Sequence, residues 1–446
     1  MRARSKTVLV AVLFTTTVSC SHAQRATLEA TYTLPRMTLA QFGNPAITET
    51  VLAKAKANGL NFTDLPSIGS GLAVAGPNEF FGITDRGPNG QAASEDDPKA
   101  KRTFPLPSFC PSITRFTLTN GEIKITQVIP YTDTKGQLIS GLSNVKGDER
   151  LYESAGAEQP IPLDPNGIDP EAIRVFPDGK FLISEEYSPS ILVVATNGRV
   201  LMRYTPTSKS IDGATYPVKA ILPDIFAQRR PNKGFENLAL SKDGKVAYAI
   251  LQSPIGDVNR EPVGGKYSIP IAESRAIRAV KLDVSDPLNA KVIGEYFVEA
   301  SLARDYSAKQ KQEKISWSDA DWMAPDKLLV IERGKSQVKL LEVDFSKATN
   351  LLERKDGSNP MFDEPSTILP TFGIRTAETR EIFSTADVGI TSTKIEGIAI
   401  LGPTEIALSN DNDFGIGDNV TGEPSRVWIV RLKKPLDLAT NAVAGK

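Results

Sequence analysis

The chain has 446 residues, of which 40% are hydrophobic and 24% are charged, and its formal net charge at pH 7 is −1. This charge argues against a general nucleic-acid binder, and the length is ample for a large hydrophobic core. Long amphipathic helix patterns are scarce, with only residues 45–58 predicting a helix, so the composition favours an all-β protein.

The first 23 residues have the features of an export signal. Basic residues precede the apolar run from Val8 to Phe14, and Ser21-His22-Ala23 offers small residues for cleavage. The run is too short to span a bilayer, so we predict no transmembrane segment and a periplasmic or extracellular protein. Attachment of a lipid at Cys20, which follows a lipobox-like sequence, is the less favoured alternative.

Cleavage after Ala23 would remove His22, the single histidine, and leave Cys110 as the single cysteine. A Ser-His-Asp triad, a Cys-His dyad, a His-ligated zinc and an intramolecular disulfide are then excluded. Carboxylate and amide oxygens remain as metal ligands. They suit Ca²⁺ best, with Mg²⁺ or Mn²⁺ as alternatives.

A pattern of two strands joined by a tight turn recurs along the chain, in units that begin at residues 70, 171, 236, 318 and 396. Each unit opens with a polar residue and ends in a polar cluster. Irregular repeats of this kind are typical of a β-propeller whose blades carry unequal insertions. The sequence therefore predicts one domain over residues 24–446, an all-β propeller of about six blades, or seven if residues 277–298 form their own blade.

The polar residues of these units are expected to meet in the central channel, because the inner strands begin there and each hairpin returns to the same end. Three units open with Glu171, Glu236 and Glu396, whereas the first opens with Ser70 and the fourth with Ser318. We predict that the three glutamates hold a cation. The alternative is that they bind backbone amides of the neighbouring blade. Further candidate ligands are Asp85, Glu186, Asp411 and, less strongly, Asp319.

Several motifs occur in an order that matches a known family. They include Thr84-Asp-Arg-Gly-Pro-Asn89, Ile168-Asp-Pro-Glu171, Lys233-Gly-Phe-Glu236, Val330-Ile-Glu332-Arg-Gly334 and Ser409-Asn-Asp-Asn-Asp-Phe-Gly415. From about Gly69 to Gly415 the chain resembles the phytase-like family, described as having esterase-like activity of phytase. The resemblance implies an exported propeller that hydrolyses phosphoesters.

A hydrolytic mechanism is consistent with these residues. Ca²⁺ held by Glu171, Glu236 and Glu396 would activate water, which makes these glutamates the candidate catalytic residues. Arg86 and Arg333 each stand beside an acidic residue and suit bidentate contact with phosphate, although an ion pair between blades is an equal alternative. We expect a monomer that acts on a small-molecule phosphoester.

Two other functions stay open at this point. A Ca²⁺-dependent lactonase or carboxylesterase would polarise a carbonyl in the same channel, and a non-catalytic propeller would bind a partner around a structural cation. Basic side chains at the channel mouth would favour the phosphoester hydrolase. An apolar mouth would favour the lactonase, and an occluded channel would favour the binding protein.

Overall fold

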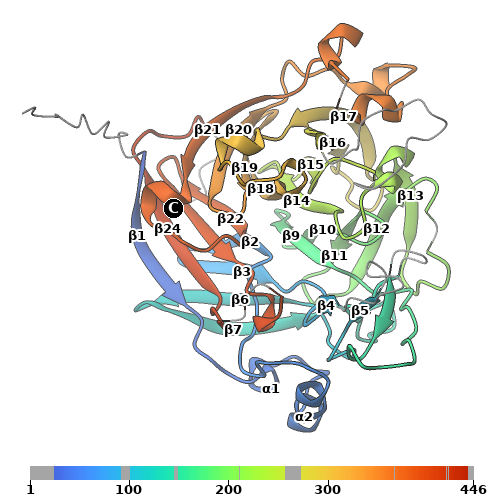
Figure 1. The fold of residues 1–446 in the computed structure, drawn as a ribbon, viewed down its shortest axis with the longest axis vertical. Coiled ribbons are helices and arrows are strands. Elements are labelled where there is room, and N and C mark those ends of the chain that lie inside the picture. Colours follow the sequence, from blue (N-terminus) through green and yellow to red (C-terminus); the bar gives the residue numbers. More distant parts are fainter. Residues whose placement is uncertain are drawn as a thin grey trace, which may run out of the picture.

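The computed structural model describes residues 25–91, 101–144, 149–209, 211–256, 273–365, 367–417, 419 and 421–439. The predicted export signal and Cys20 lie outside these residues. Within them, the strands form a ring of blades whose inner strands meet around a common centre, which confirms the all-β propeller (Figure 1).

Each blade is a four-stranded sheet whose innermost strand lies at the channel. The first blade contains β2 (Gly71–Gly76), β3 (Glu79–Ile83), β6 (Ser112–Thr119) and β7 (Glu122–Pro130). The second contains β9 (Pro170–Val175), β10 (Phe181–Glu185), β11 (Ser190–Val194) and β12 (Val200–Pro206), to which β13 (Val218–Leu222) adds in parallel. The third contains β14 (Phe235–Leu240), β15 (Val246–Leu251), β16 (Ala276–Asp283) and β17 (Lys291–Glu299).

The last two blades complete the ring. The fourth contains β18 (Ser316–Ala324), β19 (Lys327–Arg333), β20 (Val338–Asp344) and β21 (Glu378–Ser384). The fifth contains β22 (Ile395–Gly402), β23 (Glu405–Asn410), β24 (Arg426–Leu432) and, as its outer strand, β1 (Ala26–Thr33). The blade that ends the chain is therefore closed by a strand from its beginning, with Ala26 opposite Leu432 and Thr33 opposite Arg426.

The described strands form five blades, which corrects the predicted number of six or seven. The inner strands β2, β9, β14, β18 and β22 each contact the next, and β22 contacts β2, so the ring is already complete. Residues 277–298 form most of β16 and β17, the outer strands of the third blade. The long interval before Glu171 is partly taken up by a small sheet of β4 (Gly90–Gln91), β5 (Lys101–Thr103) and β8 (Arg150–Tyr152).

Local sequence explains the hairpins. Asp178-Gly179 forms the turn between β9 and β10, where Gly179 has a φ of 85°, a conformation that glycine adopts without steric penalty. At the ring centre a Cβ at Gly71 would lie 2.8 Å from Ala172 Cα, so only glycine lets β2 approach β9 this closely. Buried apolar side chains then fill the spaces between neighbouring blades, as in the cluster that joins Leu182, Leu238 and Trp317.

Helices are few. The helix predicted over residues 45–58 is observed as α2 (Glu49–Ala57), capped by the Thr48 side chain and buried through Leu52 and Ala55. It lies beside α1 (Leu39–Phe42) at the edge of the propeller (Figure 1). The short 3₁₀ helices are η1 (Asp224–Gln228), η4 (Ala303–Asp305), η5 (Gln312–Lys314), η6 (Leu351–Glu353), η7 (Pro360–Asp363), η8 (Leu369–Phe372), η9 (Thr385–Val388) and η10 (Asp413–Gly415).

Candidate functional site

A cavity of about 380 Å³ lies where several inner strands begin and several second strands end. Described acidic side chains that line it are Asp85, Glu171, Glu186, Glu236, Glu396, Asp411 and Asp413. Described basic side chains that line it are Arg86, Arg102, Lys233, Arg333 and Lys394. The structure thus brings together all of the sequence-derived candidates except Asp319.

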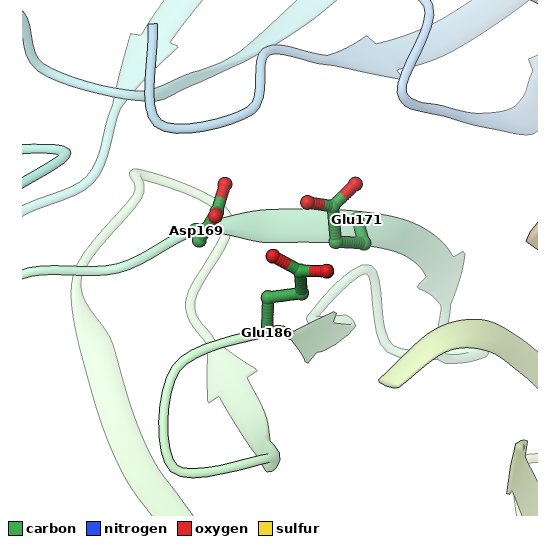
Figure 2. Close-up of side chains that lie close together, drawn as sticks. All are labelled: Asp169, Glu171 and Glu186. Carbon is green, nitrogen blue, oxygen red and sulfur yellow. The ribbon is translucent and has the colours of Figure 1, made fainter. Parts of the chain in front are cut away.

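Three carboxylates form a compact group that we call the acidic trio: Asp169, Glu171 and Glu186. Each offers an oxygen that lies within 4.8 Å of the oxygens offered by the other two, and all three residues are buried. Figure 2 shows Glu186 pointing from the loop after β10 toward Asp169 and Glu171. Neither Glu186 carboxylate oxygen has a hydrogen-bond partner among the described residues, although both are buried.

Strand geometry explains how the trio forms. Asp169 and Glu171 flank Pro170 at the start of β9, and residues two apart in a strand point to the same face. The strand β10 runs antiparallel to β9 and places Glu185 opposite Pro170, so Glu186 follows directly beside the pair. Asp169 was missed as a candidate from the sequence. Its two-residue spacing from Glu171 was the signal that could have identified it.

Burial and crowding raise the pKa values of two of the three carboxylates, Glu171 and Asp169. Burial, followed by the negative charges of Asp169, Glu236 and Glu186, raises the pKa of Glu171 well above its usual value. Burial also raises the pKa of Asp169 to about 7, although Arg86 partly opposes this shift. A divalent cation would relieve this repulsion, and the set of oxygen donors fits one.

Arg86 lies beside the trio. Its Nε is 3.1 Å from Asp169 Oδ2 and its Nη2 is 3.8 Å from Glu186 Oε2, while its backbone nitrogen donates to Asp169 Oδ1 at 3.0 Å. The guanidinium also approaches Glu149 Oε1 at 3.4 Å and donates to the Tyr187 hydroxyl. Arg86 thus compensates part of the negative charge and orients two of the three carboxylates.

Glu236 and Glu396, the remaining glutamates of the cavity, are paired with the Arg333 side chain. Arg333 lies 3.4 Å from Glu236 Oε2 through its Nη2 and pairs with Glu396 through its Nη1. Ser318 Oγ donates to Glu236 at 3.1 Å. Burial nevertheless raises the pKa of Glu236 to about 8, with Arg333 opposing the shift.

The acidic residues after β23 are paired with Lys394, a lysine that was not a candidate from the sequence. Lys394 Nζ lies 3.2 Å from Asp411 Oδ2, 3.7 Å from Glu396 Oε1 and in contact with Asp413. Burial raises the pKa of Asp411, but Lys394 and the Ser67 hydroxyl outweigh it, so the net shift is downward. Lys394 stands two residues before Glu396, and this spacing was its only signal in the sequence.

Asp319 and Lys233 differ from expectation in opposite ways. Asp319 does not line the cavity: its carboxylate accepts from Arg174 Nη2 at 2.7 Å and from the Ile398 backbone nitrogen at 3.1 Å, so it links blades. Lys233 does line the cavity and was not predicted. Burial lowers the pKa of Lys233, although the charges of Glu236 and Glu186 oppose this.

The ring of blades and the cavity lined by acidic and basic side chains define the chain as a β-propeller with a charged site at one end of its ring. Residues 67–414 match the phytase-like family, described as esterase-like activity of phytase, and the chain belongs to that family. The predicted family membership is therefore confirmed.

One individual relative matches the chain over only part of its length. An uncharacterized secreted protein of Arthroderma benhamiae is 27% identical over 165 residues, a match that covers 31% of this chain and 32% of the relative. The chain thus spans about a third of that relative's length.

Similar solved structures include a calcium-binding protein, regucalcin, of Agrobacterium tumefaciens, at 11% identity and a TM-score of 0.37, covering 86% of this chain and 95% of that one. A luciferin-regenerating enzyme matches at 9% identity and a TM-score of 0.35, covering 85% and 96%. Among the described residues, no helix combines the length and the apolar character needed to cross a membrane.

Proposed function

We propose that this protein is an exported phosphoester hydrolase that depends on a divalent cation, with Ca²⁺ as the expected ion. One observation carries the proposal: the cavity that is lined by the basic side chains Lys233 and Arg333 is also lined by Glu186, whose two buried carboxylate oxygens have no hydrogen-bond partner among the described residues. Membership of the phytase-like family and the secreted relative support the same conclusion.

The acidic trio is the best candidate to hold the cation. The sequence favoured Glu171, Glu236 and Glu396 as ligands, but Glu236 and Glu396 already share Arg333. In the acidic trio, Asp169 and Glu186 lie near Arg86, and Glu171 forms no ion pair with any described residue. A bound divalent cation would supply activation of water and neutralisation of phosphate oxygens.

The other residues of the cavity have distinct roles in this proposal. Lys233 and Arg333 would bind the phosphate oxygens, as charge-assisted donors do. Glu236 Oε2 already accepts from Ser318, so Oε1 would hold a proton near neutral pH and transfer it to the leaving oxygen. Arg86 would keep Asp169 and Glu186 in position. Hydrolysis on this scheme needs no covalent intermediate.

The lining of the cavity favours this function over a lactonase or carboxylesterase. Ile416 is the one apolar side chain among the described lining residues, apart from glycines. A lactone or an apolar ester would gain little from such a surface, whereas a phosphate group would be attracted to its lysine and arginine side chains.

The test is hydrolysis by the protein without residues 1–23. Phosphomonoesters, phosphodiesters, phytate, lactones and carboxylesters are assayed with Ca²⁺ or with EDTA. We expect phosphate release that requires Ca²⁺. Its rate should fall about 100-fold or more in Glu186→Gln, because loss of a direct ligand of the cation should cost more activity than loss of a residue that only contacts a ligand. Glu122→Gln, at an exposed position of β7, is the matched control. Turnover in EDTA, retained activity in Glu186→Gln, or activity on lactones alone would overturn the proposal.

A further inference from the structure

Two amide side chains of the charged cavity have buried oxygens without a partner. Gln252 Oε1 and Asn232 Oδ1 are buried, and neither has a hydrogen-bond partner among the described residues. Both residues line the same cavity as Glu186, and Gln252 is only 3% exposed. A buried acceptor without a donor has lost its contact with water and gained nothing in return, so a ligand that donates to it recovers this cost.

Gln252 occupies a position that carries a carboxylate in two other blades. It follows the last residue of β15, as Glu186 follows β10 and Asp411 follows β23. A carboxylate at this position compensates a positive charge, whereas the amide of Gln252 has no net charge and offers an oxygen that accepts hydrogen bonds. The third blade therefore contributes a neutral acceptor to a cavity in which the second and fifth blades contribute charge.

The backbone of Gln252 is fixed by hydrogen bonds on both sides. Its nitrogen donates to the Gly234 oxygen at 2.8 Å, and its oxygen accepts from the Trp317 nitrogen at 2.8 Å. The first contact lies within the third blade, and the second joins this blade to β18 of the fourth. Because Gly234 directly follows Lys233, these bonds hold Gln252 beside the segment that carries Lys233 and Glu236.

We propose that Gln252 determines substrate specificity by accepting a hydrogen bond from a free hydroxyl group of the leaving alcohol. In the proposed function, on which this inference rests, Lys233 binds the phosphate and Glu236 protonates the leaving oxygen. Gln252 is held beside both residues, which places its unpartnered oxygen next to the leaving alcohol. The substrate class is then a phosphomonoester of a polyhydroxy compound that keeps free hydroxyl groups. Phytate, whose hydroxyl groups are all esterified, lacks the required donor.

Binding is measured with phosphonate analogues, in which carbon replaces the ester oxygen, so that Ca²⁺ can be present without turnover. The probes are the analogues of α-glycerol phosphate and propyl phosphate, which differ only in their free hydroxyl groups. We expect the glycerol analogue to bind about tenfold more tightly and Gln252→Met to abolish this preference, because methionine offers no comparable acceptor. Gln127→Met, at an exposed position of β7, is the matched control and should retain the preference. Absent or equal affinities for the two probes, or an unchanged preference in Gln252→Met, would overturn the inference.

Turnover separates this inference from the proposed function. The ratio of kcat/KM for α-glycerol phosphate to that for propyl phosphate should fall about tenfold in Gln252→Met and stay constant in Gln127→Met. A preference for the glycerol analogue that Gln252→Met abolishes, without turnover by any form of the protein, would support recognition by Gln252 and overturn the hydrolase. Turnover with an unchanged ratio, or a higher kcat/KM for phytate than for α-glycerol phosphate, would overturn the inference alone.

A calcium titration distinguishes a second role for Gln252, because amide oxygens also bind Ca²⁺. The Ca²⁺ affinity of Gln252→Met should stay within about twofold of that of the unmodified protein, since the acidic trio holds the cation in the proposed function. A larger loss would make Gln252 a ligand of the cation and overturn its role in specificity. Asn232 is kept in every variant, because its φ of 55° is a conformation that asparagine adopts more readily than most residues. Thermal melting establishes that each variant is folded.

Discussion

Arg203 and Glu185 form a fully buried ion pair in which Nη2 lies 2.7 Å from Oε2. The same guanidinium donates to the Tyr187 backbone oxygen at 3.1 Å, and Glu185 accepts from the Asp169 backbone nitrogen at 3.2 Å. The pair therefore holds the residues on both sides of Glu186 and the backbone of Asp169. It positions the acidic trio without lining the cavity.

Replacement of Arg203 should weaken both the fold and the proposed cation site. Arg203→Met leaves the Glu185 carboxylate buried without its cation, which costs about 3–5 kcal/mol of the free energy of unfolding. Displacement of the trio should lower Ca²⁺ affinity about tenfold or more, as loss of an outer-shell contact does. Urea unfolding and calcium titration measure the two effects. Arg199→Met, at an exposed position nearby, is the control, and an effect no larger than its own would contradict the prediction.

A second buried ion pair, between Arg174 and Asp319, should stabilise the fold by linking two blades. Arg174 and Asp319 belong to β9 and β18, inner strands that are not neighbours in the ring, so their 2.7 Å contact crosses between blades. Arg174→Met should cost about 3–5 kcal/mol of the free energy of unfolding, and the double variant with Asp319→Asn should recover part of this loss. Denaturant unfolding of both variants measures the coupling. Lys180→Met, at the exposed pair with Asp178, should cost less than about 1 kcal/mol. Additive losses in the double variant would show that the pair is not coupled.

The repeat units at residues 70, 171, 236, 318 and 396 predicted the inner strand of every described blade. The error in blade number came from the interval before Glu171, where length alone cannot distinguish a blade from an insertion. Strand periodicity likewise placed the three glutamates at one end of the channel. It could not show that Arg333 lies between Glu236 and Glu396, because these residues are 97 and 63 positions away and no local pattern encodes that pairing.

The stability of the cation-free protein should fall as the pH rises. Burial raises the pKa of Glu236 to about 8, against the opposing effect of Arg333, and burial raises the pKa of Asp319 to about 7, against that of Arg174. In the unfolded chain these groups titrate near pH 4, so between about pH 4 and 8 the folded state binds more protons. The free energy of unfolding then decreases with rising pH across this window.

Thermal melting in EDTA from pH 5 to 8 measures this dependence. We expect Tm to decrease across the range and the slope to be shallower in Glu236→Gln, which removes one titrating group. Glu122→Gln on the surface should retain the slope of the unmodified protein. A Tm that rises over the same range, or a Glu236→Gln slope identical to that of the control, would contradict the assignment.

The N-terminal strand β1 should stabilise the fifth blade. This strand pairs with β24 over most of its length, and Ala26 at its start is fully buried, so it completes a blade that would otherwise end in an open edge. A chain that begins at Leu34 should melt at a lower temperature and aggregate more readily, because unpaired strand edges associate with one another. Hydrogen exchange should accelerate first in β22 to β24, whose Glu396 reaches the cavity. A chain that begins at Arg25 is the control, and addition of a peptide with the sequence of residues 25–33 should restore protection to the truncated form. Equal protection of β24 in both chains would mean that the fifth blade is stable with three strands.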